Sequence, residues 1–472
     1  MNQMQLNNKP LRLSTIIGYG AGNFGYGFVT QMITSYLVFY ATAVLLLPGS
    51  LIGLVVSLSI VWDAISDPVM GYISDNTRSK FGKRHLYILC GTFLIALTNI
   101  MLWHVKIDID MWIKFIWIFS SLFLIKTFVT VFITPYAALG AELSTDYNER
   151  SKIQAVKTIF FLTALIIVTA VCMFVFFRPT PEYELGQLNP QAYKNIAYTS
   201  SLVMLLTGLW TYFSTKSYKT ETKVSHGKHP LSEFVGQIRY SLKCKDFRDV
   251  FIGYLFTNLA SAIIGVIGLH TFTYTFYMNN YKISIVLGTQ FLVCIFAQPI
   301  WVKIARKIDK KAAVKLGLMI SIVGCMMLFG LVVLRRQVMI HYEYMIAYAV
   351  VIGFGTSGLF SLPLSMVADT VDQQELETGE RSEGIYFGML NFGYKMSQSI
   401  AILILGFVLD MIKFNPNIDI QNDFTSMALG VVLSIGSLLS FILANKVYSS
   451  YSLNEEKIEA IQRQIHLKRM SQ

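Results

Sequence analysis

The chain has 472 residues, of which 54% are hydrophobic and only 14% are charged. Soluble domains carry about 25% charged residues, so this composition excludes an ordinary soluble protein and indicates a polytopic membrane protein. The formal charge of +11 does not indicate nucleic-acid binding, because the basic residues lie in loops between apolar runs. The five scattered cysteines show no CxxC or Cys/His spacing, so they indicate neither a disulfide framework nor a metal site. We expect no cofactor.

Twelve apolar stretches are each long enough to cross a bilayer, which takes about 20 residues of helix. In chain order we expect membrane-spanning helices at 15–44, 50–74, 85–104, 112–139, 153–177, 196–215, 249–277, 284–303, 313–334, 343–368, 383–411 and 424–447. The fold class is therefore an all-α membrane protein with two six-helix halves. The first half covers residues 1–215, a polar cytoplasmic linker covers 216–248, and the second half covers 249–447.

We expect residues 448–472 to form a cytoplasmic tail. Their pattern is typical of a short amphipathic helix, and a solvated tail is the default expectation. The loops on the side of the N-terminus carry most of the Lys and Arg residues. The positive-inside rule therefore places both termini in the cytoplasm, and we expect a monomer in the plasma membrane, in contact with lipid. The first apolar run is interpreted as a retained helix, because no small-residue cleavage site follows a short apolar core.

The two halves repeat a pattern. DPVMGYISDNTRSKFGKRH (67–85) ends the second expected helix, and QPIWVKIARKIDKKAAVK (298–315) ends the eighth. Both run from a polar residue and a proline, through an apolar turn, to a basic loop. Paired six-helix repeats are one architecture of secondary transporters. In this alignment Asp67 corresponds to Gln298 and Asp63 to Cys294, so only the first half carries acidic residues there.

Five stretches together carry a family resemblance: WDAISDPVMGYISDNTRSKFGKR (62–84), FYATAV (39–44), ITPYAALGAELSTDYNER (133–150), MVADTVDQQELETGERSEG (366–384) and NFGYK (391–395). They resemble the glycoside–pentoside–hexuronide:cation symporters, a branch of the major facilitator superfamily that includes the melibiose carrier. The resemblance spans almost the whole chain. It implies a transporter that couples a cation to the uptake of a small solute by alternating access.

Asp63 and Asp67 are four residues apart, so they share one face of the second helix. Two ionised carboxylates ~5 Å apart repel by about 3 kcal/mol at an effective dielectric constant near 20, so a cation, a proton or a basic side chain must offset them. The resemblance implies that both hold the coupling cation: Na⁺, with Li⁺ or H⁺ as alternatives. Ser66 can add a hydroxyl, and Thr130 matches a threonine of the family's fourth helix.

Lys126 departs from the family pattern, because the melibiose carrier has a small residue at this position. Three roles stay open. Its ammonium can occupy the cation's place beside Asp63 or Asp67, which leaves a proton-coupled carrier or an uncoupled facilitator. It can instead point into a cavity and attract an anionic substrate, or it can snorkel or pair structurally.

The residues that bind galactosides in the melibiose carrier are absent, so either a sugar is held by other groups or the substrate is not a neutral sugar. The sugar-binding carboxylates of the melibiose carrier match Gly27 and Ile133, and an arginine of the fifth helix matches Thr158, next to Lys157. Intramembrane lysines favour an anionic small molecule, such as a hexuronide, or an amphipath with an anionic head, such as a lysolipid. The candidate substrate-binding residues are Asn23, Tyr26, Lys126, Phe360, Asn391 and Lys395.

Charged residues in three cytoplasmic loops are candidate gating residues, with a solvated, topology-setting role as the alternative. They are Asp75, Arg78, Lys83, Arg84, Asp146, Arg150, Asp369 and Arg381. Two further function classes are weaker. A membrane enzyme would need a nucleophile or a metal cluster, but the histidines do not group with acids inside the membrane, so we expect no enzyme. A transporter-like receptor usually adds a sensory domain, which the sequence does not suggest.

Overall fold

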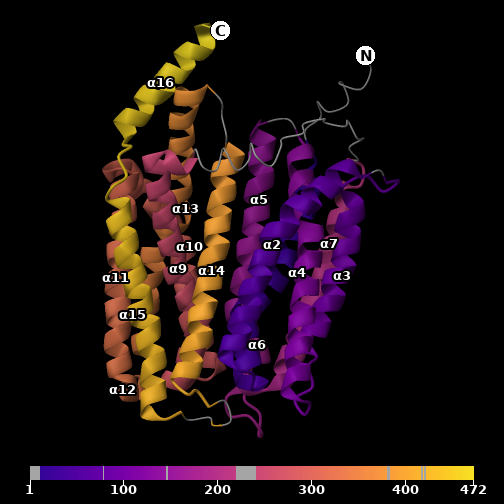
Figure 1. Cartoon of the computed structure of the whole chain (residues 1–472), viewed down its shortest axis with the longest axis vertical. Coiled ribbons are helices and arrows are strands. Elements are labelled where there is room, and N and C mark those ends of the chain that lie inside the picture. Colours follow the sequence, from indigo (N-terminus) through magenta and orange to yellow (C-terminus); the bar gives the residue numbers. More distant parts are fainter. Residues whose placement is uncertain are drawn as a thin grey trace. The chain divides into compact units, whose positions relative to one another are not determined.

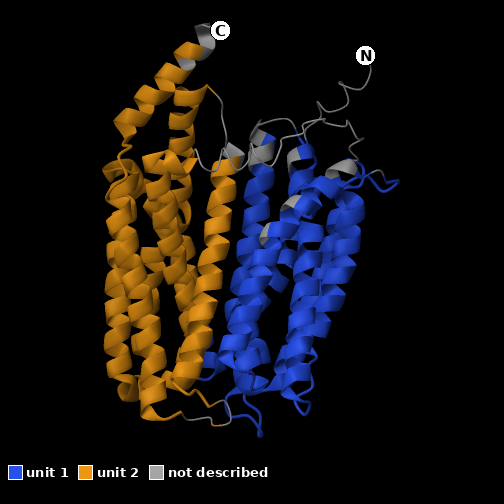
Figure 2. Ribbon diagram, viewed as in Figure 1, with its two compact units in different colours: residues 1–226, 279–284 blue, residues 227–278, 285–472 orange. Residues whose placement is uncertain are grey.

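The computed structural model describes residues 11–77, 79–144, 147–218, 241–379, 383–415, 418 and 421–471. Within these residues it has twelve helices that are long and apolar enough to cross a membrane, which confirms the predicted spans and the all-α fold class. The chain forms two compact units (Figure 2). Unit 1 comprises residues 1–226 and 279–284, and unit 2 comprises residues 227–278 and 285–472.

Unit 1 contains the first six spans (Figure 1). Its elements are α1 (Leu13–Phe39), continued by a π-helical turn (Tyr40–Val44), α2 (Gly49–Asn76), α3 (His85–Trp103), α4 (Met111–Glu142), α5 (Tyr147–Ile166), continued by a π-helical turn (Ile167–Cys172) and α6 (Met173–Phe176), a 3₁₀ turn (Gly186–Leu188) and α7 (Pro190–Thr215). Side-chain caps define two of the starts: Asp110 accepts from the amide of Trp112, and Asn189 accepts from that of Gln191.

Unit 2 contains the last six spans, apart from the first residues of α10. Its elements are α9 (Lys245–His270), continued by a π-helical turn (Thr271–Thr275), α10 (Asn280–Ile308), α11 (Lys310–Val333), α12 (Arg335–Ile340), α13 (Glu343–Thr378), α14 (Glu383–Met411), α15 (Asp423–Tyr448) and α16 (Glu455–Ser471). Asp309, with a positive φ of 74°, caps α11, and Asn422 caps α15.

The same packing pattern occurs in both units. In unit 1, α1 packs against α5 and α7, and α3 packs against α4 and α7. In unit 2, α9 packs against α14 and α15, and α11 packs against α13 and α15. Small residues allow the close approach: a Cβ on Gly91 would lie 2.8 Å from Phe132, and one on Gly208 would overlap Thr92. The sequence repeat is thus matched by a repeat in helix packing.

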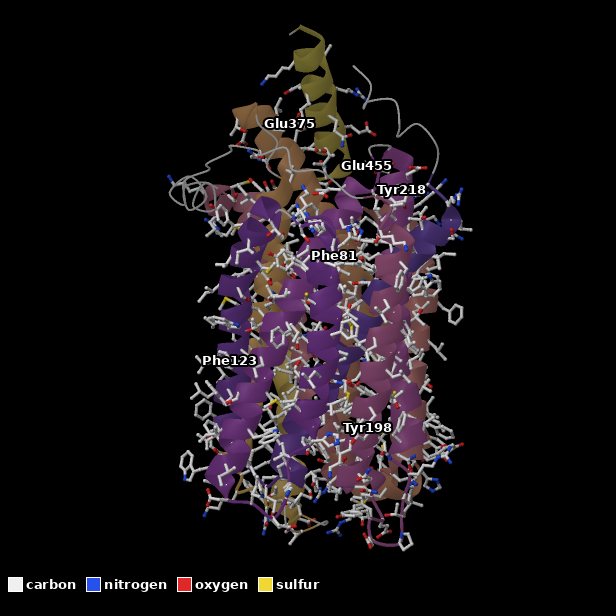
Figure 3. The ribbon with its side chains drawn as sticks, turned by 90° about the vertical axis from the view of Figure 1, so that its right-hand side faces the viewer. Phe81, Phe123, Tyr198, Tyr218, Glu375 and Glu455 are labelled. Atoms are coloured by element: carbon white, nitrogen blue, oxygen red, sulfur yellow. The ribbon has the colours of Figure 1, made fainter. Side chains whose placement is uncertain are left out.

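The C-terminal segment forms the expected amphipathic helix, and this helix packs on unit 2 while most of its side chains stay exposed. Helix α13 has 36 residues, many more than the ~20 needed to cross a bilayer, and α16 packs against it. Figure 3 shows Glu375, near the end of α13, and Glu455, at the start of α16, toward the same end of this unit. Ile458 and Ile465 are buried, which makes α16 part of the folded unit.

Candidate cation and substrate sites

The acidic pair lies in the middle of unit 1, on the face of α2 that packs against α4. Asp63 is only 6% exposed and Asp67 is half-buried, whereas Trp62, Ile65 and Val69 of the same helix are exposed. The helical period thus separates the two carboxylates from the apolar side chains of α2, as expected for a spanning helix whose acids face the protein interior.

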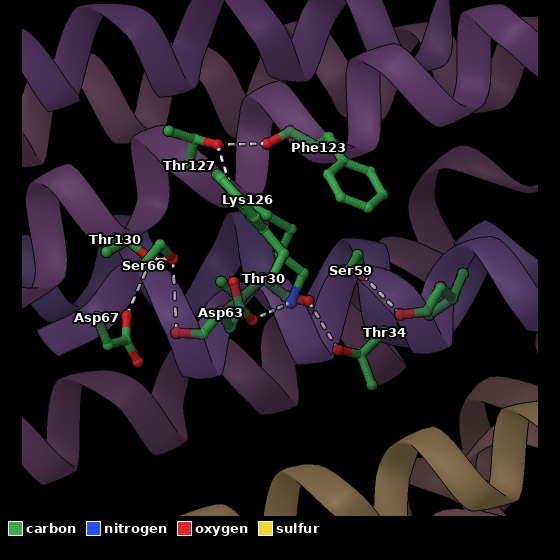
Figure 4. A network of polar contacts seen from close by, with 12 residues as sticks. Thr30, Thr34, Ser59, Asp63, Ser66, Asp67, Phe123, Lys126, Thr127 and Thr130 are labelled. Carbon is green, nitrogen blue, oxygen red and sulfur yellow. Dashed lines mark hydrogen bonds and ion pairs between the residues drawn. The ribbon is translucent and has the colours of Figure 1, made fainter. Parts of the chain in front are cut away.

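Helix α4 presents its own pair of polar residues to these acids (Figure 4). The Lys126 ammonium lies 2.9 Å from Asp63 Oδ2, and the Thr130 hydroxyl donates to Asp67 Oδ1 at 2.9 Å. Ser66 Oγ lies 3.2 Å from Thr130 Oγ1, so hydroxyls fill the space between the two contacts. Asp63 and Asp67 are four residues apart on α2, and Lys126 and Thr130 are four residues apart on α4, so the two contacts lie one helical turn apart. We call these four residues the charged ladder.

The ladder carries a residual negative charge. Two carboxylates and one ammonium leave a formal charge of −1 on Asp63, Asp67 and Lys126. At 2.9 Å the Coulomb attraction between Lys126 and Asp63 is about 6 kcal/mol at an effective dielectric constant of 20, which exceeds the repulsion of about 3 kcal/mol between the carboxylates. However, Asp63 Oδ1 is buried and accepts no hydrogen bond from the described residues. This oxygen suits one monovalent cation or one proton.

Neighbouring contacts fix the lysine-bearing turn of α4. The Thr127 hydroxyl donates to the carbonyl of Phe123 at 2.7 Å, and the Trp62 indole donates to the Thr127 hydroxyl at 2.9 Å. The Lys126 side chain is 22% exposed, so its ammonium is only partly shielded from solvent. Of the three roles left open for Lys126, the contact with Asp63 matches the first, and it is also compatible with a structural pair.

The corresponding ladder of unit 2 is neutral. Asp63–Lys126 and Asp67–Thr130 are each separated by 63 residues, and so are Cys294–Ser357 and Gln298–Ser361. There the Ser361 hydroxyl donates to the Gln298 side-chain oxygen at 3.0 Å, and the Ser357 hydroxyl donates to the Cys294 carbonyl at 2.6 Å. The charged ladder is therefore specific to unit 1.

Three candidate substrate residues belong to unit 1: Lys126, described above, Asn23 and Tyr26. The buried Asn23 amide donates to the carbonyl of Lys157 at 3.0 Å, so it joins α1 to α5. Tyr26 stacks on Phe161, with ring centroids 6.2 Å apart. A Cβ on Gly27 would lie 2.8 Å from the Phe161 ring, so this position has no room for the carboxylate that the melibiose carrier has there.

The other three candidate substrate residues belong to unit 2. Phe360 on α13 is 49% exposed, Asn391 on α14 is exposed, and Lys395, one turn after Asn391, is half-buried. A further intramembrane lysine, Lys157 on α5, is not one of the candidate substrate-binding residues. Its ammonium lies 5.6 Å from the centroid of the Tyr136 ring and pairs with no carboxylate of the described residues. The signal for it was a lone lysine within an apolar span.

The candidate gating residues fall into two groups. In unit 1 Arg84 donates to Glu142 at 3.0 Å and to Ser74 at 2.6 Å, and Lys83 lies 3.1 Å from Glu142. In unit 2 Lys310 lies 2.7 Å from Asp369. The side chains of Asp75, Arg78, Asp146, Arg150 and Arg381 lie outside the part of the chain that the structure describes.

Sequence reasoning missed the partners Glu142 and Lys310. In unit 1 the pair joins the basic loop before α3 to Glu142 on the next span, α4. In unit 2 Lys310, at the start of α11, pairs with Asp369 on the next span, α13. The available signal was the charge at the end of an otherwise apolar run: Glu142 closes α4, and Lys310 opens α11.

Comparisons with known proteins agree with this architecture. The sequence profile of the family described as MFS/sugar transport protein matches residues 18–455. A sodium-dependent lysophosphatidylcholine symporter of Danio rerio is 23% identical over 93% of this chain and 87% of its own. A glucuronide carrier protein homolog of Escherichia coli is 22% identical over 96% of this chain and 95% of its own. An inward-facing bacterial homolog of the lysosomal transporter Spinster shares the fold, with a TM-score of 0.69, 11% identity and coverage of 96% of this chain and 99% of its own.

Proposed function

Because the chain belongs to the MFS/sugar transport protein family and is a multi-pass transporter rather than an enzyme, we propose that it is a secondary active symporter. In this proposal one monovalent cation drives the movement of a small glycoside, hexuronide or similar solute by alternating access. Relatives whose names describe glycoside/cation and lysophosphatidylcholine symporters support cation coupling in general.

One observation carries the proposal: in a ladder of formal charge −1, the buried Oδ1 of Asp63 has no hydrogen-bond partner in the part of the chain that the structure describes. Lys126 offsets one of the two negative charges, and a transported cation would offset the other. When that cation leaves, the residual charge and the unsatisfied oxygen would be exposed together. The cost of that state would link cation release to a change in conformation.

The coupling ion in this proposal is Na⁺, with H⁺ as the alternative. Hard cations bind oxygen ligands, and the ladder supplies carboxylate oxygens from Asp63 and Asp67 and hydroxyl oxygens from Ser66 and Thr130. A proton would need only the unpartnered carboxylate oxygen. The sodium dependence in the name of the zebrafish relative favours testing Na⁺ first.

The proposed solute is anionic. Lysine is costly within a membrane span, and Lys157 and Lys395 lie in spans of units 1 and 2. Asn23, Tyr26, Phe360 and Asn391 remain proposed substrate contacts. The glucuronide carrier homolog and the lysophosphatidylcholine symporter are named for molecules with acidic groups, which supports this choice. The packing of Gly27 against Phe161 argues against a sugar-binding site that uses a carboxylate of the first helix.

A second candidate function rests on the ion pair between Lys126 and Asp63. If the lysine replaces the coupling cation permanently, the protein is an uncoupled facilitator or a carrier of lysolipid-like amphipaths. In both proposals we expect a monomer in the plasma membrane with both termini in the cytoplasm. We also retain a gating role for Lys83, Arg84 and Asp369.

Uptake into proteoliposomes distinguishes the two candidates. The wild type and Asp67→Asn are given a panel of glycosides, glucuronides and lysolipids with a Na⁺, Li⁺ or pH gradient. Symport predicts uptake that one cation gradient stimulates at least about tenfold and that Asp67→Asn abolishes, because the variant removes the residual charge. Uptake that no cation gradient changes in the wild type would reject symport in favour of the facilitator.

A further inference from the structure

A cavity of about 490 Å³ lies in unit 2, apart from the charged ladder. Its walls come from the end of α10, the start of α11, the middle of α13 and the C-terminal segment that leads into α16. The volume falls within the range of small-molecule sites. No candidate site of the sequence analysis includes this cavity as a whole, although Asp369 lies in its wall.

The wall supplied by the C-terminal segment is firmly attached. The amide of Ser452 donates to Asp246 Oδ1 at 2.6 Å, and Lys311 donates to the carbonyl of Tyr451 at 2.7 Å. Tyr451 is buried, and its burial beside Asp369 and Asp246 raises the pKa of its hydroxyl well above the ordinary value. Farther along, the Gln462 side chain donates to Asp372 at 2.9 Å. The C-terminal wall of the cavity is therefore folded structure rather than a loose tail.

Some charged side chains of the cavity form ion pairs with other residues of the protein, and others do not. Lys310 is paired with Asp369, and Glu459 is paired with Arg463. Arg306 has no ion-pair partner within the described residues.

Two carboxylates of the cavity also have capacity to bind a ligand. Glu455 has no ion-pair partner within the described residues either, and Asp309 uses one oxygen to cap α11. The cavity thus offers one guanidinium for an anion and two carboxylates for a cation.

The remaining wall is apolar and continues toward exposed apolar surface. Leu362, Leu453 and Ile458 are buried in the lining, and Val302 is exposed at its edge. On α10, Ile300 and Ile308 are also exposed, and both belong to a helix that is long and apolar enough to cross a membrane. An occupant with a charged head and an apolar body matches this arrangement.

We propose that this cavity binds the headgroup of a phospholipid with a primary ammonium, of the phosphoethanolamine type. Arg306 binds the phosphate, Glu455 and Asp309 accept hydrogen bonds from the ammonium, and the apolar edge at Val302 receives the start of the acyl chains. A headgroup with only negative charge would face two carboxylates, and a choline headgroup has no N–H to donate. The site therefore favours phosphatidylethanolamine over phosphatidylglycerol and phosphatidylcholine.

Native mass spectrometry of the full-length protein, doped with each lipid in turn, tests this proposal. We expect phosphatidylethanolamine to bind at least about tenfold more tightly than the other two lipids, since each charge-assisted hydrogen bond is worth about that factor. Arg306→Gln and Glu455→Gln should each remove the preference. Lys307→Gln is the matched control, because it removes a positive charge of α10 next to Arg306 that does not line the cavity.

Thermal unfolding in detergent provides a second readout that does not depend on adduct counting. Phosphatidylethanolamine should raise the melting temperature of the wild type and of Lys307→Gln but not of Arg306→Gln. Equal binding of the three lipids, or a preference that Arg306→Gln and Glu455→Gln both retain, would overturn the proposal. Stabilisation by free phosphoethanolamine without any preference among the lipids would assign the cavity to a soluble zwitterion and likewise overturn it.

Discussion

Replacing Lys126 by methionine tests the electrostatics of the charged ladder. The substitution keeps the length of the side chain and removes the ammonium that lies 2.9 Å from Asp63. The formal charge of the ladder changes from −1 to −2. A cation ~5 Å from the freed carboxylate gains about 3 kcal/mol at an effective dielectric constant of 20, which corresponds to an upper limit of roughly 200-fold in affinity.

Part of this gain is lost, because Asp63 must remain buried without a partner until the cation arrives. Breaking a buried ion pair costs about 3–5 kcal/mol, and the 22% exposure of Lys126 places the cost toward the lower end. We therefore expect Lys126→Met to melt at a lower temperature without sodium. In sodium it should regain stability and bind Na⁺ about 10- to 100-fold more tightly than the wild type.

The assay follows the melting temperature and the intrinsic fluorescence as Na⁺ is added at pH 8. Because the chain has six tryptophans, versions with Trp62→Phe identify the contribution of Trp62. Trp62 is a local reporter, because its indole bonds to the hydroxyl of Thr127, next to Lys126. Lys114→Met is the control, since Lys114 is a buried lysine of the same helix that bonds to the carbonyl of Leu45 and not to an acid. If Lys126→Met and Lys114→Met titrate with the same Na⁺ midpoint as the wild type, Lys126 does not compete with a cation and the charge argument fails.

Two further predictions concern other parts of the chain. Glu142→Gln removes the acceptor shared by Lys83 and Arg84, so it should lower the free energy of unfolding by about 1–3 kcal/mol; in a thermal melt the control Glu182→Gln, at an exposed residue, should show no loss of stability. Burial, with Glu377 and Asp246 nearby, raises the pKa of the Cys244 thiol, so its thiolate is scarce at neutral pH. In a variant with Cys244 as its only cysteine, maleimide labelling should be slower than for a free thiol at pH 7 and should accelerate above pH 9; a rate equal to that of a free thiol at pH 7 would contradict the burial.

The spans and the acidic pair were predictable from sequence for simple physical reasons. The thickness of the bilayer fixes the length of an apolar helix, so twelve long apolar runs indicated twelve spans. Helical periodicity also placed Asp63 and Asp67 on one face, and the position of Lys126 one turn before Thr130 made a contact with the acids one of its open roles. These inferences need only the geometry of a single helix or of two adjacent ones.

The partners of the loop charges were not predictable in the same way. The pair between Arg84 and Glu142 joins residues 58 positions apart, and neither periodicity nor composition indicates which acid a basic loop will meet. The bond from Asn23 to the carbonyl of Lys157 is similar, because it depends on how closely α1 approaches α5. The docked α16 was missed because a highly charged amphipathic stretch is as compatible with solvent as with a protein surface.

The repeated ladder explains why one unit would carry the ion and the other would not. Both units place two polar positions on one helix opposite two on another, at the same separation along the chain. In unit 2 Gln298 and Ser361 satisfy each other, and Ser357 bonds to the carbonyl of Cys294, so this ladder is complete with protein groups alone. In unit 1 no donor among the described residues reaches Asp63 Oδ1. A buried carboxylate oxygen is costly unless it is paired, so a cation or proton bound at the charged ladder would remove a cost that the neutral ladder does not have.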